Sequence, residues 1–379
     1  MAPSRRAVFI HSDEIEKYHY PENCPFRSER AGKVRQTLVS MGLLTGPGIS
    51  EVAPKRAERQ SLKRFHSARY LHALKNAAKG RWDVEALHMG IGTDDVPIFL
   101  GMADYAILAA GATLVGAELI VSDSVDVAFN PSGGYHHALP EKAAGFCYIN
   151  DNAIACDYLA EAGKRVLYLD VDVHHGDGLA YGFYDRSDIM TISLHENPKV
   201  LFPGTGFEDE IGKGPGKGYC VNLPLPMGTY DEAYMHAFKE IVVPLIGAYN
   251  PDVIVFELGA DTLAGDPLAH LQLTNNTYVE IINRLLQFGK PILATGGGGY
   301  NVENTVRAWS LAWTVLTGAD DHLDLSAAMG GVMMESTDWQ GGLRDRALPV
   351  TDQQRQTVIP TLQQSIETLK AKIFAIHGL

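Results

Sequence analysis

Two segments of the chain have residue types that could carry out metal-dependent chemistry, and one of them spaces acidic and imidazole side chains as a metal ion requires. In the segment DVDVHHGDG at 170–178, Asp172 and His174 are two residues apart, so in extended backbone they point to the same side. A third ligand must come from elsewhere, and Asp261, after another apolar run, is the natural candidate. Two carboxylates and one imidazole with an open position are typical of a catalytic rather than a structural zinc site. An isolated Asp-x-His pair would more often be a satisfied polar turn.

The second segment, GGYHH at 133–137, contains two adjacent histidines. A water activated by a metal needs a base to take its proton, and the leaving group needs an acid. His136 and His137 could supply both roles if each were backed by a carboxylate, and Asp170 and Asp177 are available in the first segment. By itself, such a pair would more often cap a turn or lie in the core.

Tyr300 follows four consecutive glycines, which allow a ligand to approach the backbone closely. Its hydroxyl could donate a hydrogen bond to an oxyanion as a tetrahedral intermediate forms. A phosphate-binding loop is disfavoured, because no Lys-Ser/Thr pair follows and Glu303 stands at the start of the next helix, where an anion would bind. Phe146 and Phe202, on loops, could line a slot for an extended apolar chain, although aromatic residues are more often core.

The elements that must position these residues alternate between short apolar runs and longer helical patterns. Buried strands are predicted at Ala7–Ile10, Val125–Phe129, Arg165–Leu169, Ile189–Leu194, Tyr219–Leu223, Val253–Leu258 and Pro291–Thr295. Helices are predicted at Ser28–Met41, Met102–Ile120, Asp151–Glu161, Asp231–Tyr249, Thr277–Phe288 and Val302–Leu316. This alternation predicts an α/β fold with one doubly wound, mostly parallel sheet covered by helices on both faces. Sites in such sheets form beyond the carboxyl ends of the strands, where four of the polar segments would converge.

The 379 residues are expected to form a single catalytic domain over 1–379, with a core at about 7–317 and a C-terminal helical extension at about 318–379. In that extension, Asp352–Ile376 has apolar residues on one face, which predicts a helix. Docking of this helix on the core is favoured over an oligomer contact, and a homo-oligomer is kept as the alternative. These apolar residues are Leu362, Ile366, Leu369 and Ile373.

Charge and composition exclude several classes of function. With 32 Lys and Arg against 45 Asp and Glu, the net charge is −13, so no direct binding of nucleic acid through a broad face is expected, although a small basic rim could steer a partner locally. No run is expected to approach the ~18 apolar residues of a membrane span. The N-terminus lacks the pattern of a signal peptide, and four cysteines without a CxxC pair indicate a reducing compartment, by default the cytoplasm.

Seven motifs in one order resemble the histone deacetylase family, the zinc-dependent lysine deacetylases with the arginase-like α/β fold. They are GGYHH (133–137), GFCYIND (145–151), DVDVHHGDG (170–178), SLH (193–195), FPGTG (202–206), GADTLAGDPL (259–268) and GGGGYN (296–301). The resemblance runs from about residue 7 to residue 317 with spacings of a class I-type domain. Stretches such as LFPGTGFEDEIG look closest to bacterial acetoin-utilisation deacetylases.

The resemblance implies hydrolysis of Nε-acetyl-lysine in an acetylated protein or peptide. It implies Zn²⁺, with Fe²⁺ as the alternative, and assigns a role to each matching position. The metal ligands would be Asp172, His174 and Asp261. His137 would be the main base and His136 its electrostatic or acid partner, and Asp170 and Asp177 would orient these two histidines. Tyr300 would polarise the acetyl carbonyl. The substrate would contact Gly145, Phe146, Phe202, Leu268 and the rim residue Asp95, and Arg30 resembles the arginine of an internal acetate-release path.

Potassium is also implied by the resemblance, at two sites near the zinc segment. The inner site would use Asp170, Asp172, His174, Ser193 and Leu194, and the outer site Phe183, Arg186, Ile189 and Tyr219. Arg186 departs from the smaller residue expected there, and Tyr135 replaces the Trp or Leu expected before the histidine pair at the tunnel floor. The chain also lacks the long charged tail of nuclear co-repressor members.

Three other functions remain open at this point. An arginase-like dinuclear manganese hydrolase would need more bridging carboxylates, and Asp266 is the only extra acid close after Asp261. An acetylpolyamine deacetylase would need a constricted entrance. A scaffold that only binds acyl-lysine would not need the intact metal ligands and Tyr300.

Overall fold

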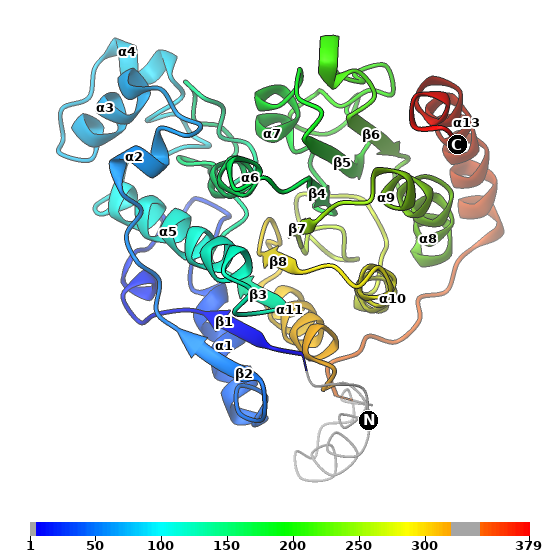
Figure 1. Cartoon of the computed structure of the whole chain (residues 1–379), viewed down its shortest axis with the longest axis horizontal. Coiled ribbons are helices and arrows are strands. Elements are labelled where there is room, and N and C mark those ends of the chain that lie inside the picture. Colours follow the sequence, from blue (N-terminus) through cyan, green and yellow to red (C-terminus); the bar gives the residue numbers. More distant parts are fainter. Residues whose placement is uncertain (1–4, 320–341) are drawn as a thin grey trace.

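A computed structural model describes residues 5–319 and 342–379. Its centre is one sheet of eight parallel strands in the order β2-β1-β3-β8-β7-β4-β5-β6 (Figure 1). The strands are β1 (Ala7–Ile10), β2 (Ile49–Val52), β3 (Val127–Asn130), β4 (Val166–Asp170), β5 (Ile189–Glu196), β6 (Cys220–Leu225), β7 (Val253–Glu257) and β8 (Ile292–Thr295). Seven are buried along their whole length, as strands covered on both faces must be. The predicted α/β fold with a parallel sheet is confirmed.

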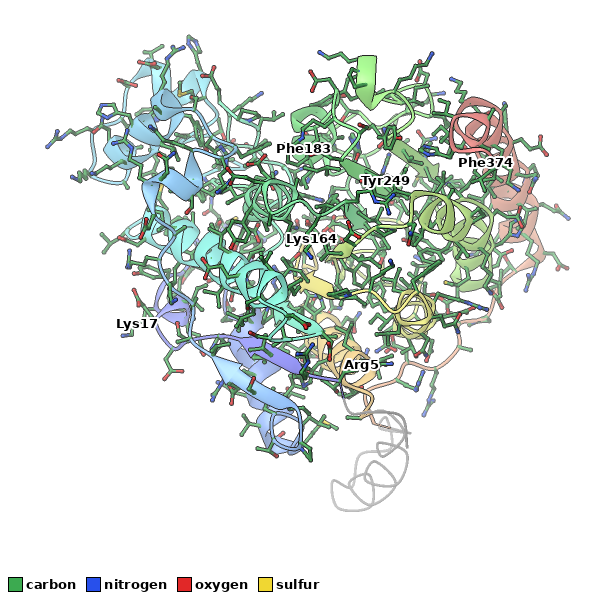
Figure 2. The ribbon with its side chains drawn as sticks, in the orientation of Figure 1. Arg5, Lys17, Lys164, Phe183, Tyr249 and Phe374 are labelled. Atoms are coloured by element: carbon green, nitrogen blue, oxygen red, sulfur yellow. The ribbon has the colours of Figure 1, made fainter. Side chains whose placement is uncertain are left out.

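Helices cover both faces of the sheet, and side chains fill the space on either side of it (Figure 2). Two clusters of buried apolar residues form the core: one includes Phe9 and Leu167, and the other includes Val8 and Tyr168. Neighbouring residues of a strand thus point to opposite faces. The helices are α1 (Arg30–Ser40), α2 (Arg59–Leu62), α3 (Ala68–Ala77), α4 (Val84–His88), α5 (Met102–Val121), α6 (Asp151–Glu161), α7 (Asp177–Gly182), α8 (Asp231–Ala237), α9 (Val243–Tyr249), α10 (Asn275–Gln287), α11 (Val302–Thr317) and α13 (Asp352–Ile373).

Differences from the sequence-based expectations are local. The edge strand β2, ISEV, was missed because it is half exposed and polar in its middle, so it lacks the apolar run of the inner strands. The single helix predicted at Asp231–Tyr249 is α8 and α9 joined by a π-helical turn at Phe238–Val242. Short helices α2, α3, α4 and α7 were not predicted, because three of them span only four to six residues and show too few turns for a periodicity.

One expectation about membranes needs correction. Helix α5 has 20 residues with a mean hydropathy of 1.6 in its most apolar window, so by length and composition it could cross a bilayer. In this structure 72% of that window is buried, and the helix packs against α6 and β3. The apolar character of this helix is explained here by the burial of most of its surface in the protein core.

The C-terminal helix α13 confirms the predicted docking on the core. Leu362, Ile366, Leu369 and Ile373 are all buried, and α13 packs against β6 and α8. Residues 320–341 of the predicted extension lie outside the described residues. The helix therefore continues the hydrophobic core beyond the edge strand β6.

Candidate active site

The four polar segments predicted to converge do so at one edge of the sheet. The strands that precede them, β3, β8, β7 and β4, are consecutive neighbours, and all run in the same direction. Their carboxyl ends therefore bring the segments at 133–137, 296–300, 259–261 and 170–177 side by side.

Asp172, His174 and Asp261 form a compact set of potential metal ligands. One ligand atom from each lies within 4.8 Å of the others, and all three residues are buried. The Nδ1 atom of His174 is 3.1 Å from Asp172 Oδ1 and 3.0 Å from Asp261 Oδ2. Two buried carboxylates against a single imidazole need a cation, so this donor set fits the zinc ion that the sequence predicts.

Backbone amides orient both ligand carboxylates. Val173 donates its N–H to Asp261 Oδ1 at 2.9 Å, and Gly298 donates its N–H to Asp172 Oδ2 at 2.6 Å. Such partners fix the direction of a ligand oxygen. The approach requires glycine: a Cβ atom on Gly298 would overlap the Asp261 carboxylate. The glycine run thus serves close backbone packing against the ligands rather than phosphate binding.

The histidine pair lies beside this set, and each ring has its own carboxylate. His136 Nδ1 is 2.8 Å from Asp170 Oδ2, and His137 Nδ1 is 2.8 Å from Asp177 Oδ1. The two Nε2 atoms are 3.0 Å apart. The pairing of each histidine with its predicted aspartate is therefore present, and the Nε2 atoms are the ones left to act.

The surroundings separate the pKa values of the two histidines. Burial and the positive charge of His136 lower the pKa of His137 to about 4. Burial acts in the same direction on His136, but nearby carboxylates, Glu257 first, outweigh it and hold the pKa of His136 well above its usual range. At neutral pH His137 is a neutral base and His136 a cation, which is the division of roles that acid–base catalysis needs.

Glu257 is a site residue that sequence analysis missed. It ends β7, fully buried, with Oε1 3.2 Å from His136 Nδ1 and Oε2 accepting a hydrogen bond from Tyr168 at 2.6 Å. A single acidic residue at the end of an apolar strand, four residues before the ligand Asp261, was the signal that could have found it. It adds a third carboxylate beside Asp170 and Asp172.

Tyr300 borders the ligand set from the β8 side, with its ring centroid 6.3 Å from that of His174. Burial raises the pKa of Tyr300 well above 10, so its hydroxyl stays a hydrogen-bond donor. Asp266 holds the backbone here: Oδ2 accepts from the N–H of Tyr300 at 2.7 Å and of Asn301 at 3.3 Å, and Oδ1 accepts from Leu268 at 2.9 Å. Sequence analysis noted Asp266 only as a spare acid and missed this role.

Phe146 and Phe202 flank the same space. The Phe146 ring is 5.7 Å from that of Tyr300, and the Phe202 ring is 4.9 Å from that of His137. Gly145, with a φ of +52°, lies between them, and a Cβ atom there would come 3.0 Å from the Phe202 ring and overlap the His137 ring. These aromatic rings therefore stand on both sides of the reactive groups, as a slot for an extended chain requires.

The predicted rim residue Asp95 is tied to this slot. Its carboxylate accepts hydrogen bonds from the Thr93 hydroxyl at 2.7 Å and from the Gly145 N–H at 3.1 Å. Its backbone carbonyl accepts from the Phe146 N–H at 3.0 Å. Asp95 thus holds the turn at Gly145 and Phe146 in place.

Comparison with known proteins agrees with this geometry. A family model described as "Histone deacetylase domain" matches residues 24–316. The acetoin utilization protein AcuC of Bacillus subtilis is 38% identical over 325 residues, covering 83% of each chain. Histone deacetylase 8 of Xenopus tropicalis is 39% identical over 324 residues, covering 84% of this chain and 86% of that protein.

The chain belongs to the histone deacetylase family.

Solved structures support the same assignment. The crystal structure of an HDAC homologue from Aquifex aeolicus superimposes with a TM-score of 0.82 at 30% identity, covering 96% of this chain and all of that one. An HDAC homologue complexed with SAHA gives a TM-score of 0.84 at 29% identity, covering 97% of this chain and all of that one. The fold of this deacetylase is thus the arginase/deacetylase fold, and the protein is a hydrolase.

Of the residues that the resemblance assigns to an inner potassium site, Asp172 and His174 also belong to the set of potential metal ligands. Asp170 and Ser193 are direct neighbours in the β4–β5 register, and Asp170 Oδ1 accepts from the Asp172 N–H at 3.0 Å. At the outer positions, the Phe183 and Tyr219 carbonyls accept backbone N–H groups of Arg186 and Thr191. The Arg186 guanidinium, the departure noted above, is ion-paired with Asp157 at 2.6 Å and Asp188 at 2.7 Å, so its charge is matched.

Arg30 is buried behind the glycine run. Its guanidinium donates to the carbonyls of Gly299 at 2.6 Å and Gly297 at 2.9 Å, and it stacks over Phe26 at 4.6 Å. Tyr135, the second departure, donates its hydroxyl to that of Tyr105 at 2.5 Å. Arg30 therefore supports the segment that carries Tyr300, whereas Tyr135 contacts helix α5.

Proposed function

We propose that this member of the histone deacetylase family hydrolyses Nε-acetyl-lysine in protein or peptide substrates, with Asp172, His174 and Asp261 as the ligands of a catalytic zinc ion. The observation that carries the proposal is the junction of a buried three-ligand set with two carboxylate-backed histidines. A zinc ion there supplies Lewis acidity toward the acetyl carbonyl and acidifies a water molecule.

The protein's own groups then have distinct tasks. His137 donates its Nδ1–H to Asp177, which leaves a lone pair on Nε2 to take a proton from the attacking water. His136, held by Asp170 and Glu257, keeps its positive charge beside the developing negative charge. As the C–N bond breaks, the proton that His137 took from water passes to the lysine nitrogen, so that acetate and the free amine leave. The Tyr300 hydroxyl donates a hydrogen bond to the oxyanion that forms as the amide carbonyl becomes tetrahedral.

The slot formed by Phe146 and Phe202 would hold the apolar stem of the lysine side chain, with Gly145 and Leu268 completing its walls. The aromatic faces favour four methylene groups over water. Asp95, at the outer end, would bind the substrate backbone while it holds the Gly145 turn.

A site for one catalytic metal is favoured over the dinuclear arginase-like alternative. A second group of potential ligands, His136, Asp172 and Glu257, shares Asp172 with the first. In that group His136 is occupied by carboxylates, because its Nδ1 lies 2.8 Å from Asp170 Oδ2 and 3.2 Å from Glu257 Oε1. We further propose potassium at the inner and outer sites assigned above, and a single catalytic domain over the whole chain.

The four cysteines are all free, which supports a reducing compartment such as the cytoplasm.

The test is turnover of an acetyl-lysine peptide with metal content measured on the same sample. The proposal predicts about one zinc ion per chain, loss of activity with a chelator and recovery with zinc. Tyr300→Phe, which removes only the hydroxyl, should lower kcat about 100-fold with zinc content unchanged. Two manganese ions per chain, or a zinc-loaded protein that binds but never cleaves acetyl-lysine, would contradict the proposal.

A further inference from the structure

One segment of this acidic chain has the opposite charge. Between Lys55 and Arg81 lie nine of the 32 Lys and Arg residues, and Glu58 is the only acid among them. The segment carries a net charge of +8 in a chain of −13, so the remaining residues together carry −21. Charge segregated to this degree creates a local positive potential that the average composition hides.

Part of this charge is matched within the protein. Arg56 pairs with Glu14 and Asp104, Arg64 with Asp157 and Glu161, and Arg69 with Glu85. For the other six cations, the part of the chain that the structure describes offers no ion-pair partner, and all six are exposed. Four of them, Arg59, Lys75, Lys79 and Arg81, lie around helix α3.

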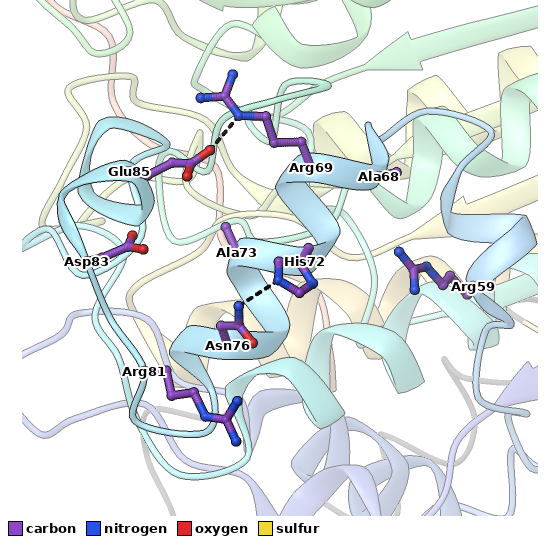
Figure 3. A pocket seen from close by; sticks show the side chains of 9 residues that line it. All are labelled: Arg59, Ala68, Arg69, His72, Ala73, Asn76, Arg81, Asp83 and Glu85. Atoms are coloured by element: carbon purple, nitrogen blue, oxygen red, sulfur yellow. Dashed lines mark hydrogen bonds and ion pairs between the residues drawn. The ribbon is translucent and has the colours of Figure 1, made fainter.

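These four cations line two hollows on the sides of helix α3. One, of about 440 Å³, is lined by Arg59, His72 and Arg81, and also by the acids Asp83 and Glu85, the latter paired with Arg69. The second, of about 540 Å³, is lined by Arg59, His72, Lys75 and Lys79 around an apolar floor, and also by Asp104, which is paired with Arg56. Figure 3 shows Arg59 and Arg81 on different sides of α3, while Arg69 is turned to Glu85. We call the surface formed by Arg59, His72, Lys75, Lys79 and Arg81 the basic groove.

The basic groove is connected to the mouth of the active site. Ser67, which caps α3, donates its backbone N–H to the carbonyl of Pro140 at 3.0 Å, and Ala143 donates to Met89 at 2.8 Å. Pro140 and Ala143 belong to the loop that continues to Gly145 and Phe146 in the slot. The lobe that carries the groove is thus hydrogen-bonded to the loop that leads into the slot.

We propose that the basic groove binds an acidic segment of the acetylated protein substrate, which selects acidic proteins over basic tails. This inference rests on the proposed function, since it assigns the substrate class of that site. Exposed cations of this kind speed encounter and add modest affinity per contact, so their effect falls with ionic strength. The apolar floor of the larger hollow suits aliphatic or aromatic residues interspersed among the acids.

A nucleic acid is the weaker candidate for this surface. Binding of a polyanion depends on many simultaneous phosphate contacts. A few cations within a segment of +8, in a chain whose residues outside that segment carry −21, match a short acidic peptide better than an extended phosphate backbone.

The test compares two labelled acetyl-lysine peptides of equal length, one with a run of Asp and Glu placed at several distances from the lysine and one with Ser and Gln in its place. Binding by fluorescence anisotropy and turnover are measured at low and high salt. For the wild type, the acidic peptide should bind and react about tenfold better at low salt and lose this advantage at high salt. Lys75→Glu/Lys79→Glu should abolish the advantage, and Lys75→Gln/Lys79→Gln should reduce it. Both variants should leave the neutral peptide unchanged.

The matched control is Lys33→Glu/Lys372→Glu, which makes the same charge change at exposed lysines of α1 and α13. It should keep the preference for the acidic peptide. If the neutral peptide is cleaved and the acidic one gains nothing, the groove proposal is overturned and the proposed function stands. If neither peptide is cleaved by zinc-loaded protein, the proposed function fails, and the anisotropy data still decide whether the groove binds acids. Two other results would overturn the groove proposal. If a single-stranded oligonucleotide displaces the acidic peptide at a lower concentration than the free acidic peptide does, the groove binds nucleic acid. If the protein self-associates and Lys75→Glu/Lys79→Glu abolishes this self-association, the groove binds a second copy of the chain.

Discussion

Asp266 offers a sharp test of how Tyr300 is positioned. The change Asp266→Asn preserves size but replaces one acceptor oxygen by an NH₂ group. The carboxylate accepts three backbone hydrogen bonds, two of them at Oδ2 from Tyr300 and Asn301. If the NH₂ group takes the place of Oδ2, two donors lose their acceptor and face another donor; if it takes the place of Oδ1, Leu268 loses its partner.

The expected loss follows from these contacts. Hydrogen bonds to a charged group contribute ~1.5–3 kcal/mol each, and a catalytic group displaced by about 1 Å can cost ~100-fold in rate. We expect kcat to fall about 30- to 100-fold, which corresponds to roughly 2–3 kcal/mol in the barrier, while KM and zinc content stay near the wild-type values.

The assay measures kcat, KM and zinc content for Asp266→Asn, Tyr300→Phe and the double variant. Because Asp266 acts through Tyr300, the double variant should be hardly slower than Tyr300→Phe alone. Asp231→Asn is the matched control: Asp231 also accepts a backbone N–H, from Thr274 at 2.7 Å, but at the start of α10. It should lower stability and leave kcat unchanged. Rate losses that multiply in the double variant, or a full rate in Asp266→Asn, would refute the reasoning.

Three further predictions address the metal, the base and the fold. Gly298→Ala should lower zinc affinity at least tenfold, measured by competition with a chromophoric chelator, because the new methyl group overlaps the Asp261 carboxylate. Asp177→Asn should move the acidic limb of the kcat/KM–pH profile to lower pH, because Asp177 raises the pKa of His137, and it should lower the plateau about tenfold. An acidic limb at the wild-type pH would contradict this prediction. Burial lowers the pKa of His66 in the folded protein to about 4, whereas an unfolded chain has a histidine pKa of about 6.5. As the pH falls below about 6.5, the unfolded chain therefore binds a proton that the folded protein does not, and the free energy of unfolding decreases. Between pH 7.5 and 5.5 this loss is about 1.4 kcal/mol, and His66→Gln should reduce the pH dependence of urea unfolding by that amount.

The residues that sequence analysis expected to converge, and that the structure brings together, share a simple geometry. Asp172 and His174 lie two apart beyond a strand, and His136, Asp261 and Tyr300 follow other strands, so knowledge of a parallel sheet was enough to bring them together. Their pairings followed because both aspartate partners lie in the same short segment as two of the ligands.

What escaped prediction depends on contacts across the fold. Glu257 was read as part of an apolar strand, and only the position of β7 beside β4 shows that it reaches His136. Asp266 accepts hydrogen bonds from residues more than 30 positions away, which no local pattern encodes. The basic groove combines cations of α2, α3 and the segment after α3, and a net charge summed over the whole chain concealed it.

A metal ion bound at the proposed ligand set would also link the folding of the protein to its supply of metal. Asp172 and Asp261 are fully buried, and their orienting amides come from the folded backbone, so the unfolded chain offers no equivalent site. A ligand that binds only the native state stabilises it by RT ln(1 + [L]/Kd), or ~2.7 kcal/mol when the free metal exceeds its dissociation constant 100-fold. The amount of folded enzyme in a cell would therefore report the availability of free metal as well as the rate of synthesis. A chelator added during expression would lower the yield of the protein, while the same chelator added after purification would lower its thermal midpoint.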